Sequence, residues 1–119
     1  MSVVLPSYNE EGMIEKTANV ITRILENEKI EHELIFVNDG SSDNTQLEIE
    51  KVADQLSNVR YIMFSRNFGK EAAIFAGLAL SKGDCVAVMD CDLQHPPETL
   101  VEMYRLWEQG YEVIEGVKK

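Results

Sequence analysis

Residues 33–43 of the chain read ELIFVNDGSSD. The first half contains an apolar run at 34–37, which is too apolar for a strand that has one face in water. The second half is a turn cluster that starts at Asp39, and Asp43 is predicted to cap a helix that follows. A buried strand followed by a turn and a helix is the repeating unit of an α/β protein with a parallel sheet.

The rest of the chain repeats this alternation of strand and helix. Further strands are expected at residues 3–5, 59–64, 85–89 and 113–114. Helices are expected at residues 11–29, from Asp43 to about Leu56, at residues 71–82, and from Pro96 to Gly110. Right-handed crossovers should place these helices on both faces of a mostly parallel sheet. Because the chain ends directly after the fifth expected strand, we expect a sheet that is truncated there.

The apolar positions predict which faces of the helices are buried. In the helix at 71–82, apolar residues lie on nearly all sides, so we expect this helix to be deeply packed. In the other helices the inward residues are expected to be Ile14, Ala18, Ile21 and Leu25, then Ile49, Val52, Ala53 and Leu56, and finally Leu100, Met103, Tyr104 and Trp107.

Composition narrows the class of protein. The chain has 119 residues, a length that suits one domain, and its formal net charge is −10. Such a charge argues against nonspecific nucleic-acid binding and against a basic patch for membrane surfaces. The longest apolar run, at 72–80, is far shorter than the roughly 20 residues that span a bilayer. With only two cysteines and no signal peptide, we expect a soluble, intracellular and acidic chain.

Polar side chains gather in the segments that follow the expected strands. These segments are residues 6–11, 38–41, 65–70 and 90–95. Ligands of open parallel sheets bind beyond the carboxyl ends of the strands, near the point where the strand order reverses. The four segments are therefore expected to form one binding rim, although polar loops that bind nothing are the alternative.

Asp90-Cys91-Asp92 is the most informative of these segments. If the segment is extended, residues i and i+2 point the same way, so that the two carboxylates converge. They repel each other unless a cation neutralises them, and Mg²⁺ or Mn²⁺ prefers such oxygen ligands. Gln94 continues the period and offers a carbonyl oxygen. A pair of solvated turn aspartates is the alternative reading.

Other polar residues of the rim admit two interpretations each. Asp39 follows a strand and suits either a hydrogen bond to a nucleobase or ribose, or a turn with no ligand. Tyr8 suits stacking on a base, and Glu10 suits either the site or the first turn of a helix. Arg66 and Lys70 offset phosphate charge or are simply solvated. The sequence has neither a glycine-rich dinucleotide-binding loop nor a Walker loop, which argues against an NAD-binding protein and against an ATPase.

A zinc site made from Cys85, Cys91 and His95 is disfavoured, because Cys85 lies in an apolar strand and paired ligand spacing is missing. A phosphatase of the haloacid dehalogenase type is disfavoured because its Asp-x-Asp motif normally follows the first strand, whereas here the motif follows the fourth expected strand. A receiver-like signalling domain that binds Mg²⁺ needs its phosphoacceptor Asp after the third strand, where Ser65 stands.

Four segments carry a resemblance to a known family: 3–11 (VVLPSYNEE), 37–43 (VNDGSSD), 66–71 (RNFGKE) and 89–98 (MDCDLQHPPE). Together they resemble the family 2 inverting glycosyltransferases, and among these the polyprenyl-phosphate sugar transferases of the dolichol-phosphate mannose synthase and bactoprenol glucosyltransferase type. The match covers essentially the whole chain, with the motifs in the family's order.

The resemblance implies a GT-A fold, of which residues 1–119 are the Rossmann-like, nucleotide-sugar-binding part. It implies a nucleotide-diphosphate sugar donor, with UDP-glucose favoured and GDP-mannose as the alternative, and Mg²⁺ or Mn²⁺ at the Asp-x-Asp motif. In this family's pattern the nucleoside is surrounded by Pro6, Tyr8, Glu10, Val37 and Asp39, with Lys70 and Asp90 near the base, ribose or diphosphate, and with Asp92, Gln94 and Asp90 at the metal. Cys91 stands where the family commonly has Ala, and its backbone role should survive.

The implied acceptor is a polyprenyl phosphate, which is ionised at pH 7 and needs little help from a general base. A sugar hydroxyl acceptor is the alternative. Family members continue with an acceptor-side half and often with membrane helices, so we expect the parent protein to act at the cytoplasmic face of a membrane. Residues 1–119 alone are expected to bind donor and metal without transferring sugar.

Overall fold

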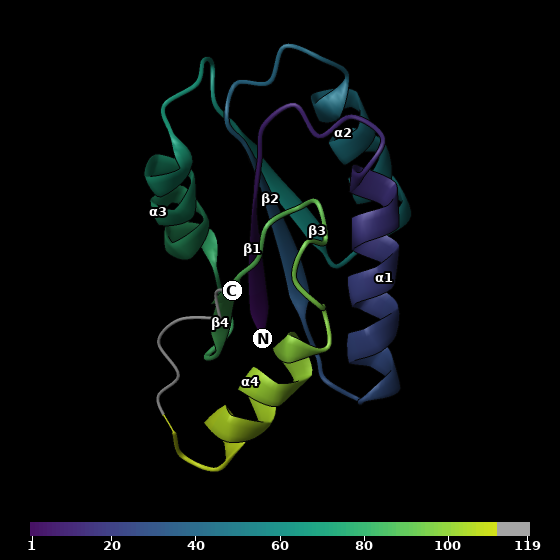
Figure 1. Ribbon diagram of the computed structural model, residues 1–119, viewed down its shortest axis with the longest axis vertical. Coiled ribbons are helices and arrows are strands. Elements are labelled where there is room, and N and C mark those ends of the chain that lie inside the picture. The colour runs from purple at the N-terminus through teal and green to yellow at the C-terminus, as the bar shows by residue number, and fades with distance from the viewer. Residues whose placement is uncertain (112–119) are drawn as a thin grey trace.

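The strands of residues 1–111, the part of the chain that the computed structural model describes, form one parallel sheet (Figure 1). The strands are β1 (Ser2–Ser7), β2 (Glu33–Asn38), β3 (Val59–Met63) and β4 (Val86–Val88). Their order in the sheet is β3-β2-β1-β4, and every pair of neighbours is parallel. The direction of winding therefore reverses between β1 and β4, which is the kind of position where α/β sheets bind ligands.

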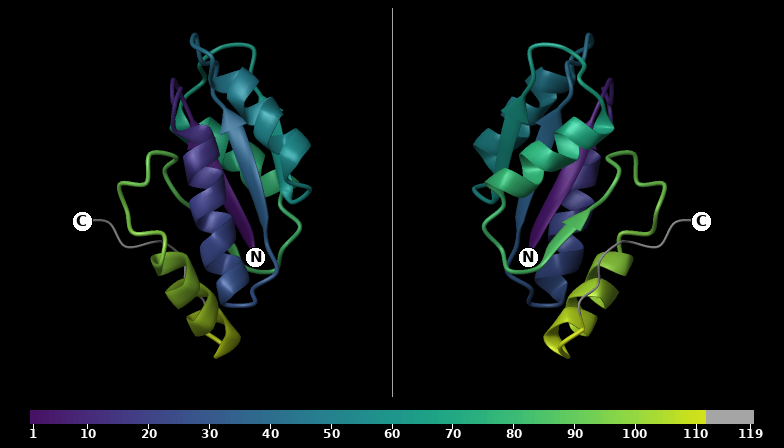
Figure 2. Two further views of the ribbon diagram at one scale, coloured as in Figure 1. Left: turned by 90° about the vertical axis from the view of Figure 1, so that its right-hand side faces the viewer. Right: turned by 90° about the vertical axis from the view of Figure 1, so that its left-hand side faces the viewer.

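Helices cover both faces of this sheet, as the alternation predicted. The helices are α1 (Ile14–Asn27), α2 (Thr45–Gln55), α3 (Lys70–Leu80) and α4 (Thr99–Glu108). Figure 1 shows α1 and α2 on one face and α3 on the other. Figure 2 shows α4 beside the lower end of α1, where Arg105 Nη2 donates a hydrogen bond to the carbonyl of Glu28 at 2.8 Å. No helix within residues 1–111 is both long enough and apolar enough to cross a membrane.

Some expected boundaries need correction. The fifth strand expected at 113–114 lies outside the described residues, and the sheet within residues 1–111 has four strands. The predicted N-cap is wrong by one residue, because α2 begins at Thr45 with Asn44 at the N-cap position. The carboxylate of Asp43 nevertheless accepts the N–H of Thr45 at 2.9 Å, so it satisfies a backbone donor at the start of α2 as a cap does.

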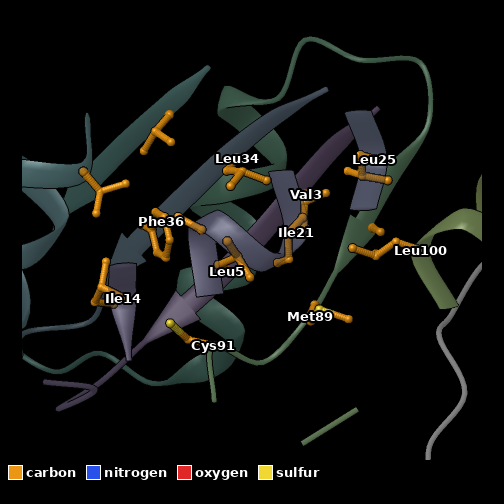
Figure 3. Close-up of a cluster of buried hydrophobic side chains, with 14 of the residues drawn as sticks. Val3, Leu5, Ile14, Ile21, Leu25, Leu34, Phe36, Met89, Cys91 and Leu100 are labelled. Carbon is orange, nitrogen blue, oxygen red and sulfur yellow. The ribbon is translucent and has the colours of Figure 1, made fainter. Parts of the chain in front are cut away.

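The core consists of two clusters, one on each face of the sheet. The larger cluster lies between the sheet and α1 and α2, and Val3, Leu5 and Phe36 from the central strands are fully buried in it (Figure 3). The smaller cluster packs under α3 and contains Val4, Ile35, Val37 and Ala73. Since successive strand residues point to opposite faces, burial on both faces explains why residues 34–37 are continuously apolar.

The prediction that the third helix is deeply packed is wrong. In α3 only Ala73 and Gly77 are buried, whereas Phe75 is 73% exposed. The helix approaches the sheet through this stripe of small residues, and a Cβ added at Gly77 would overlap the side chain of Val4. Trp107 is also more exposed than predicted, because α4 buries only Leu100, in its first turn.

A polar network closes the opposite, amino-terminal end of the sheet around the carboxylate of Glu33. Ser2 Oγ and the N–H of Lys82 donate to Glu33 Oε2 at 2.6 and 2.8 Å. Arg60 Nη2 donates to Glu33 Oε1 at 2.9 Å and also to the carbonyl of Leu80 at 2.7 Å. Burial by itself would raise the pKa of Glu33, but these donors together lower it below its ordinary value.

The first prediction concerns the contact between α3 and β1. Gly77→Ala should lower the free energy of unfolding by about 1–3 kcal/mol, because overlap with Val4 forces a shift in the core. In an unobstructed helix the same change would stabilise by about 1 kcal/mol. Ala79→Gly, at an exposed position of the same helix, measures that intrinsic difference. Urea denaturation gives both values, and a Gly77→Ala variant more stable than wild type would contradict this packing.

The second prediction concerns Glu33. Glu33→Gln should lower the free energy of unfolding at pH 7 by about 1–3 kcal/mol, because an amide NH₂ then faces the donors that the carboxylate accepted. The folded-state pKa lies below the ordinary 4.5, so the stabilisation is complete above that value and is lost as the pH falls through the lowered folded-state pKa. Urea denaturation across acidic buffers should therefore show wild type and variant converging, whereas the exposed control Glu31→Gln should track wild type throughout.

Candidate functional site

The loops that follow β1 and β2 are joined by hydrogen bonds at the carboxyl end of the sheet. The N–H of Asn9 donates to Ser41 Oγ at 2.9 Å, and Asn9 Oδ1 accepts the N–H of Ser42 at 2.8 Å. The N–H of Glu10 donates to Thr45 Oγ1 at 2.8 Å. These bonds hold the backbone at Asn9 and Glu10, and the preceding residue, Tyr8, is 48% exposed.

Asp39 joins the loop after β2 to the loop after β3. Its residue is only 4% exposed. Its Oδ1 accepts the N–H of Phe68 at 2.7 Å, and its Oδ2 accepts the N–H of Gly69 at 3.0 Å. Asn67 Nδ2 donates to Asp39 Oδ2 and to the Asp39 carbonyl, both at 3.1 Å. The next residue, Gly40, has φ +71° and lies so close to residues 66 and 67 that a Cβ there would overlap their backbone.

Lys70 joins the loop after β3 to the loop after β4. It is the first residue of α3, and its Nζ lies 2.7 Å from Asp90 Oδ1. The side chain of Lys70 is 59% exposed and that of Asp90 36% exposed, so both remain reachable from solvent. With this ion pair, polar contacts connect the loops that follow β2, β3 and β4 along one rim, as the spacing of the polar segments predicted.

The acidic residues of this rim converge near Glu10. Burial raises the pKa of Glu10 above its ordinary value, and the neighbouring carboxylates of Asp92, Asp90 and Asp43 raise it further. The extended conformation expected for Asp90-Cys91-Asp92 is wrong, however, because β4 ends at Val88 and residues 91–92 form a turn. In that turn Asp92 Oδ1 accepts the N–H of Gln94 at 3.2 Å.

Cys91, between the two aspartates, belongs to the core. It is 1% exposed and its side chain lies in the larger cluster, close to Leu5 in Figure 3. Burial raises the pKa of the Cys91 thiol to about 12, so the thiol stays protonated at neutral pH. The hydroxyl of Thr17 donates to the Cys91 carbonyl, which anchors the turn to α1.

The oxygen ligands of the rim suit a hard divalent cation. Asp90 and Asp92 supply carboxylates, and Gln94 is exposed with an amide oxygen to offer. Within residues 1–111 no group of three or more His, Cys, Asp or Glu side chains is arranged to hold a metal ion. Carboxylate and amide oxygens are the ligand types that Mg²⁺ and Mn²⁺ prefer, and such cations commonly complete their shell with water and substrate phosphates.

Other residues predicted for the site occupy different positions. Pro6 and Val37 are partners in the pairing of β1 with β2, and the side chain of Val37 is fully buried in the smaller core cluster. Sequence reasoning did not single out Asn67 and Thr17, whose side chains fix the loops. The position of Thr17 on the apolar face of the first helix could have indicated that its hydroxyl bonds to a buried group. Nothing in the sequence near Asn67 indicates that its amide bonds to Asp39.

Comparisons with known proteins identify the family of the chain. The family model described as "Glycosyl transferase family 2" matches residues 2–117. The CsbB protein of Bacillus subtilis (strain 168) is 43% identical over 114 residues, which are 96% of this chain and 35% of CsbB. The undecaprenyl-phosphate 4-deoxy-4-formamido-L-arabinose transferase of Proteus mirabilis (strain HI4320) is 39% identical over 96% of this chain and 35% of its own length. The bactoprenol glucosyl transferase of Shigella phage SfV is 38% identical over 96% of this chain and 37% of its own length.

Solved structures show the same fold. TarS 1–349 of S. aureus in complex with UDP matches with a TM-score of 0.73 and 28% identity, over 91% of this chain and 32% of the 1–349 chain. The mannosyltransferase PcManGT of Pyrobaculum calidifontis, in complex with GDP-Man and Mn²⁺, matches in fold with a TM-score of 0.70 and 24% identity, over 83% of this chain and 29% of its own. The chain thus spans about a third of the length of its relatives.

Proposed function

Because the chain belongs to glycosyl transferase family 2, we propose that it is the donor-binding part of an inverting, metal-dependent enzyme. The enzyme moves a sugar from a nucleotide-diphosphate sugar to a polyprenyl phosphate. The observation that carries this proposal is the rim at the reversal of strand order, where the acidic group of Glu10, Asp90 and Asp92 lies beside Lys70. The similar proteins named for undecaprenyl phosphate and bactoprenol support the acceptor class.

In this proposal the donor lies across the carboxyl ends of β1, β2 and β4. Tyr8 and Glu10 flank the nucleoside from the first loop, Pro6 and Val37 lie near the ends of β1 and β2 beneath it, and Asp39 follows β2. Lys70 and Asp90 lie towards the ribose and diphosphate. UDP-glucose is the favoured donor, in line with the bound UDP of the TarS complex, and GDP-mannose is the alternative.

Asp92, Gln94 and Asp90 would hold the cation. A bound Mg²⁺ or Mn²⁺ acts as a Lewis acid that stabilises the negative charge of the departing nucleoside diphosphate. The turn at 91–92 holds these ligands in place, because the Cys91 carbonyl accepts a hydrogen bond from Thr17 and the Cys91 thiol is buried. The proposal therefore gives Cys91 a backbone role and leaves the metal to oxygen ligands.

The proposed phosphate acceptor demands less of the protein than a hydroxyl acceptor would. Such an acceptor is already ionised at pH 7, so direct displacement at the sugar carbon requires no proton acceptor on the protein. A sugar hydroxyl must lose its proton during transfer and would require one. The lipid acceptor implies that the longer protein works at a membrane surface, which we propose to be the cytoplasmic face.

The third prediction tests donor and metal binding. Calorimetry should detect UDP-glucose binding to the 119-residue chain in the presence of Mn²⁺, and chelation of the metal should weaken it. Asp92→Asn should weaken binding at least about tenfold, or 1.4 kcal/mol, because a metal carboxylate is lost. The control Asp84→Asn removes an exposed carboxylate at the other end of β4 and should bind like wild type. No binding by wild type in any of these conditions would contradict the proposal.

The fourth prediction tests the acceptor. A longer protein that contains this chain should transfer glucose from UDP-glucose to undecaprenyl phosphate and should leave undecaprenol, which has a hydroxyl in place of the phosphate, unmodified. Radiolabelled transfer into the lipid fraction measures this, with GDP-mannose as the competing donor. Transfer to a free glycan hydroxyl, with none to undecaprenyl phosphate, would refute the acceptor class and leave donor binding intact.

A further inference from the structure

The turn that carries Asp92 has few backbone ties to the rest of the protein. The N–H of Met89 donates to the Val4 carbonyl at 3.0 Å, just beyond the last paired residues of β4 and β1. In the part of the chain that the structure describes, residues 90–95 make no backbone–backbone hydrogen bond. The N–H of Gln94 donates within the turn, to Asp92 Oδ1. The conformation of this turn therefore depends on contacts made by side chains.

Thr17 of α1 supplies a contact that reaches the backbone of the turn. The residue is fully buried, and its hydroxyl donates to the carbonyl of Cys91, which is itself 1% exposed. Packing of the Cys91 side chain in the larger core cluster holds its Cα atom but does not set the direction of the next peptide plane (Figure 3). The Cys91 carbonyl and the Asp92 N–H belong to that one planar group. The bond from Thr17 therefore fixes the plane from which Asp92 departs.

The turn also holds a backbone conformation that residues other than glycine rarely adopt. Leu93, between Asp92 and Gln94, has φ +61°, in the left-handed region. This conformation is unfavourable for leucine and persists only where surrounding contacts maintain it. Loss of the Thr17 hydroxyl would leave a buried carbonyl without a donor. A rotation of the turn would restore a partner for that carbonyl and relax Leu93, and it would displace Asp92 and Gln94.

We infer that Thr17 is a positioning residue for the cation, which acts through the Cys91 carbonyl and touches neither metal nor nucleotide. The inference rests on the proposed function and deepens it, because it makes the cation affinity of Asp92 and Gln94 depend on a buried hydroxyl of α1. Groups that hold metal ligands in place commonly change metal affinity by about 10- to 100-fold when they are removed. A threonine that only stabilises the fold would change stability and leave cation affinity unaltered.

The experiment makes the same substitution at two buried positions of α1. Thr17→Val keeps the shape of the side chain and removes the donor to Cys91. The matched control is Thr22→Val, because the Thr22 hydroxyl is buried and has no hydrogen-bond partner within residues 1–111. Mn²⁺ binding, measured by electron paramagnetic resonance of the free ion, should weaken at least about tenfold in Thr17→Val. It should match wild type in Thr22→Val and in Thr17→Ser, which restores the hydroxyl.

Two further measurements separate positioning from general destabilisation. In Thr17→Val, UDP affinity with Mn²⁺ should fall, whereas affinity for uridine, which has no phosphate to share the cation, should equal that of wild type. Amide resonances of residues 92–94 should shift in Thr17→Val and not in Thr22→Val, with no metal added. A Thr17→Val variant that is less stable in urea but binds Mn²⁺ as wild type does would overturn the inference. An equal loss of uridine and UDP affinity would overturn it too.

If Thr17→Val does not fold, Thr17→Cys takes its place, because a thiol of similar size is a weaker donor than a hydroxyl. This variant should weaken Mn²⁺ binding by at least about threefold, and wild-type affinity would overturn the inference. Failure of the proposed function gives a different result, in which wild type itself binds neither Mn²⁺ nor UDP. That result would refute the proposed site and the inference together, whereas the outcomes above overturn the role of Thr17 alone.

Discussion

A buried carboxylate must have hydrogen-bond donors around it, and that requirement at Asp39 determines the shape of the rim. The donors come from a loop 28 to 30 residues further along the chain, so the bonds close one βα unit onto the next. Gly40 makes this closeness possible, because any side chain there would overlap the backbone of residues 66 and 67. The start of α3, and with it Lys70, follows from this contact.

The pattern of strands and helices was predictable because it depends on burial, which the sequence displays directly. The continuous apolar run at 34–37 requires cover on both faces, and α1 and α3 provide it. The packing of α3 was not predictable in the same way. The helix is apolar on most sides, but the size of its side chains decides which side packs on the sheet. The small residues Ala73 and Gly77 allow a closer approach than Phe75 does.

The candidate site was predictable as a collection of loops but not as a set of contacts. Parallel strands bring their carboxyl ends to one edge, so the grouping of Glu10, Asp39, Lys70 and Asp90 follows from topology alone. Which side chain bonds to which depends on loop conformations that local sequence does not determine. The expected extended geometry of Asp90 to Asp92 failed for this reason, since the chain turns directly after a strand of only three residues.

Part of the net charge of −10 comes from carboxylates that lie together in this rim. Burial raises the pKa of Glu10, and the nearby carboxylates of Asp92 and Asp90 raise it further by like-charge repulsion, which a cation would relieve. Lys70 relieves part of it through its ion pair with Asp90, but a single ammonium is outnumbered by the carboxylates around it. A diphosphate would add further negative charge to the same place. Under the proposed function a divalent cation would offset this charge, so that an acidic rim and an anionic donor are compatible.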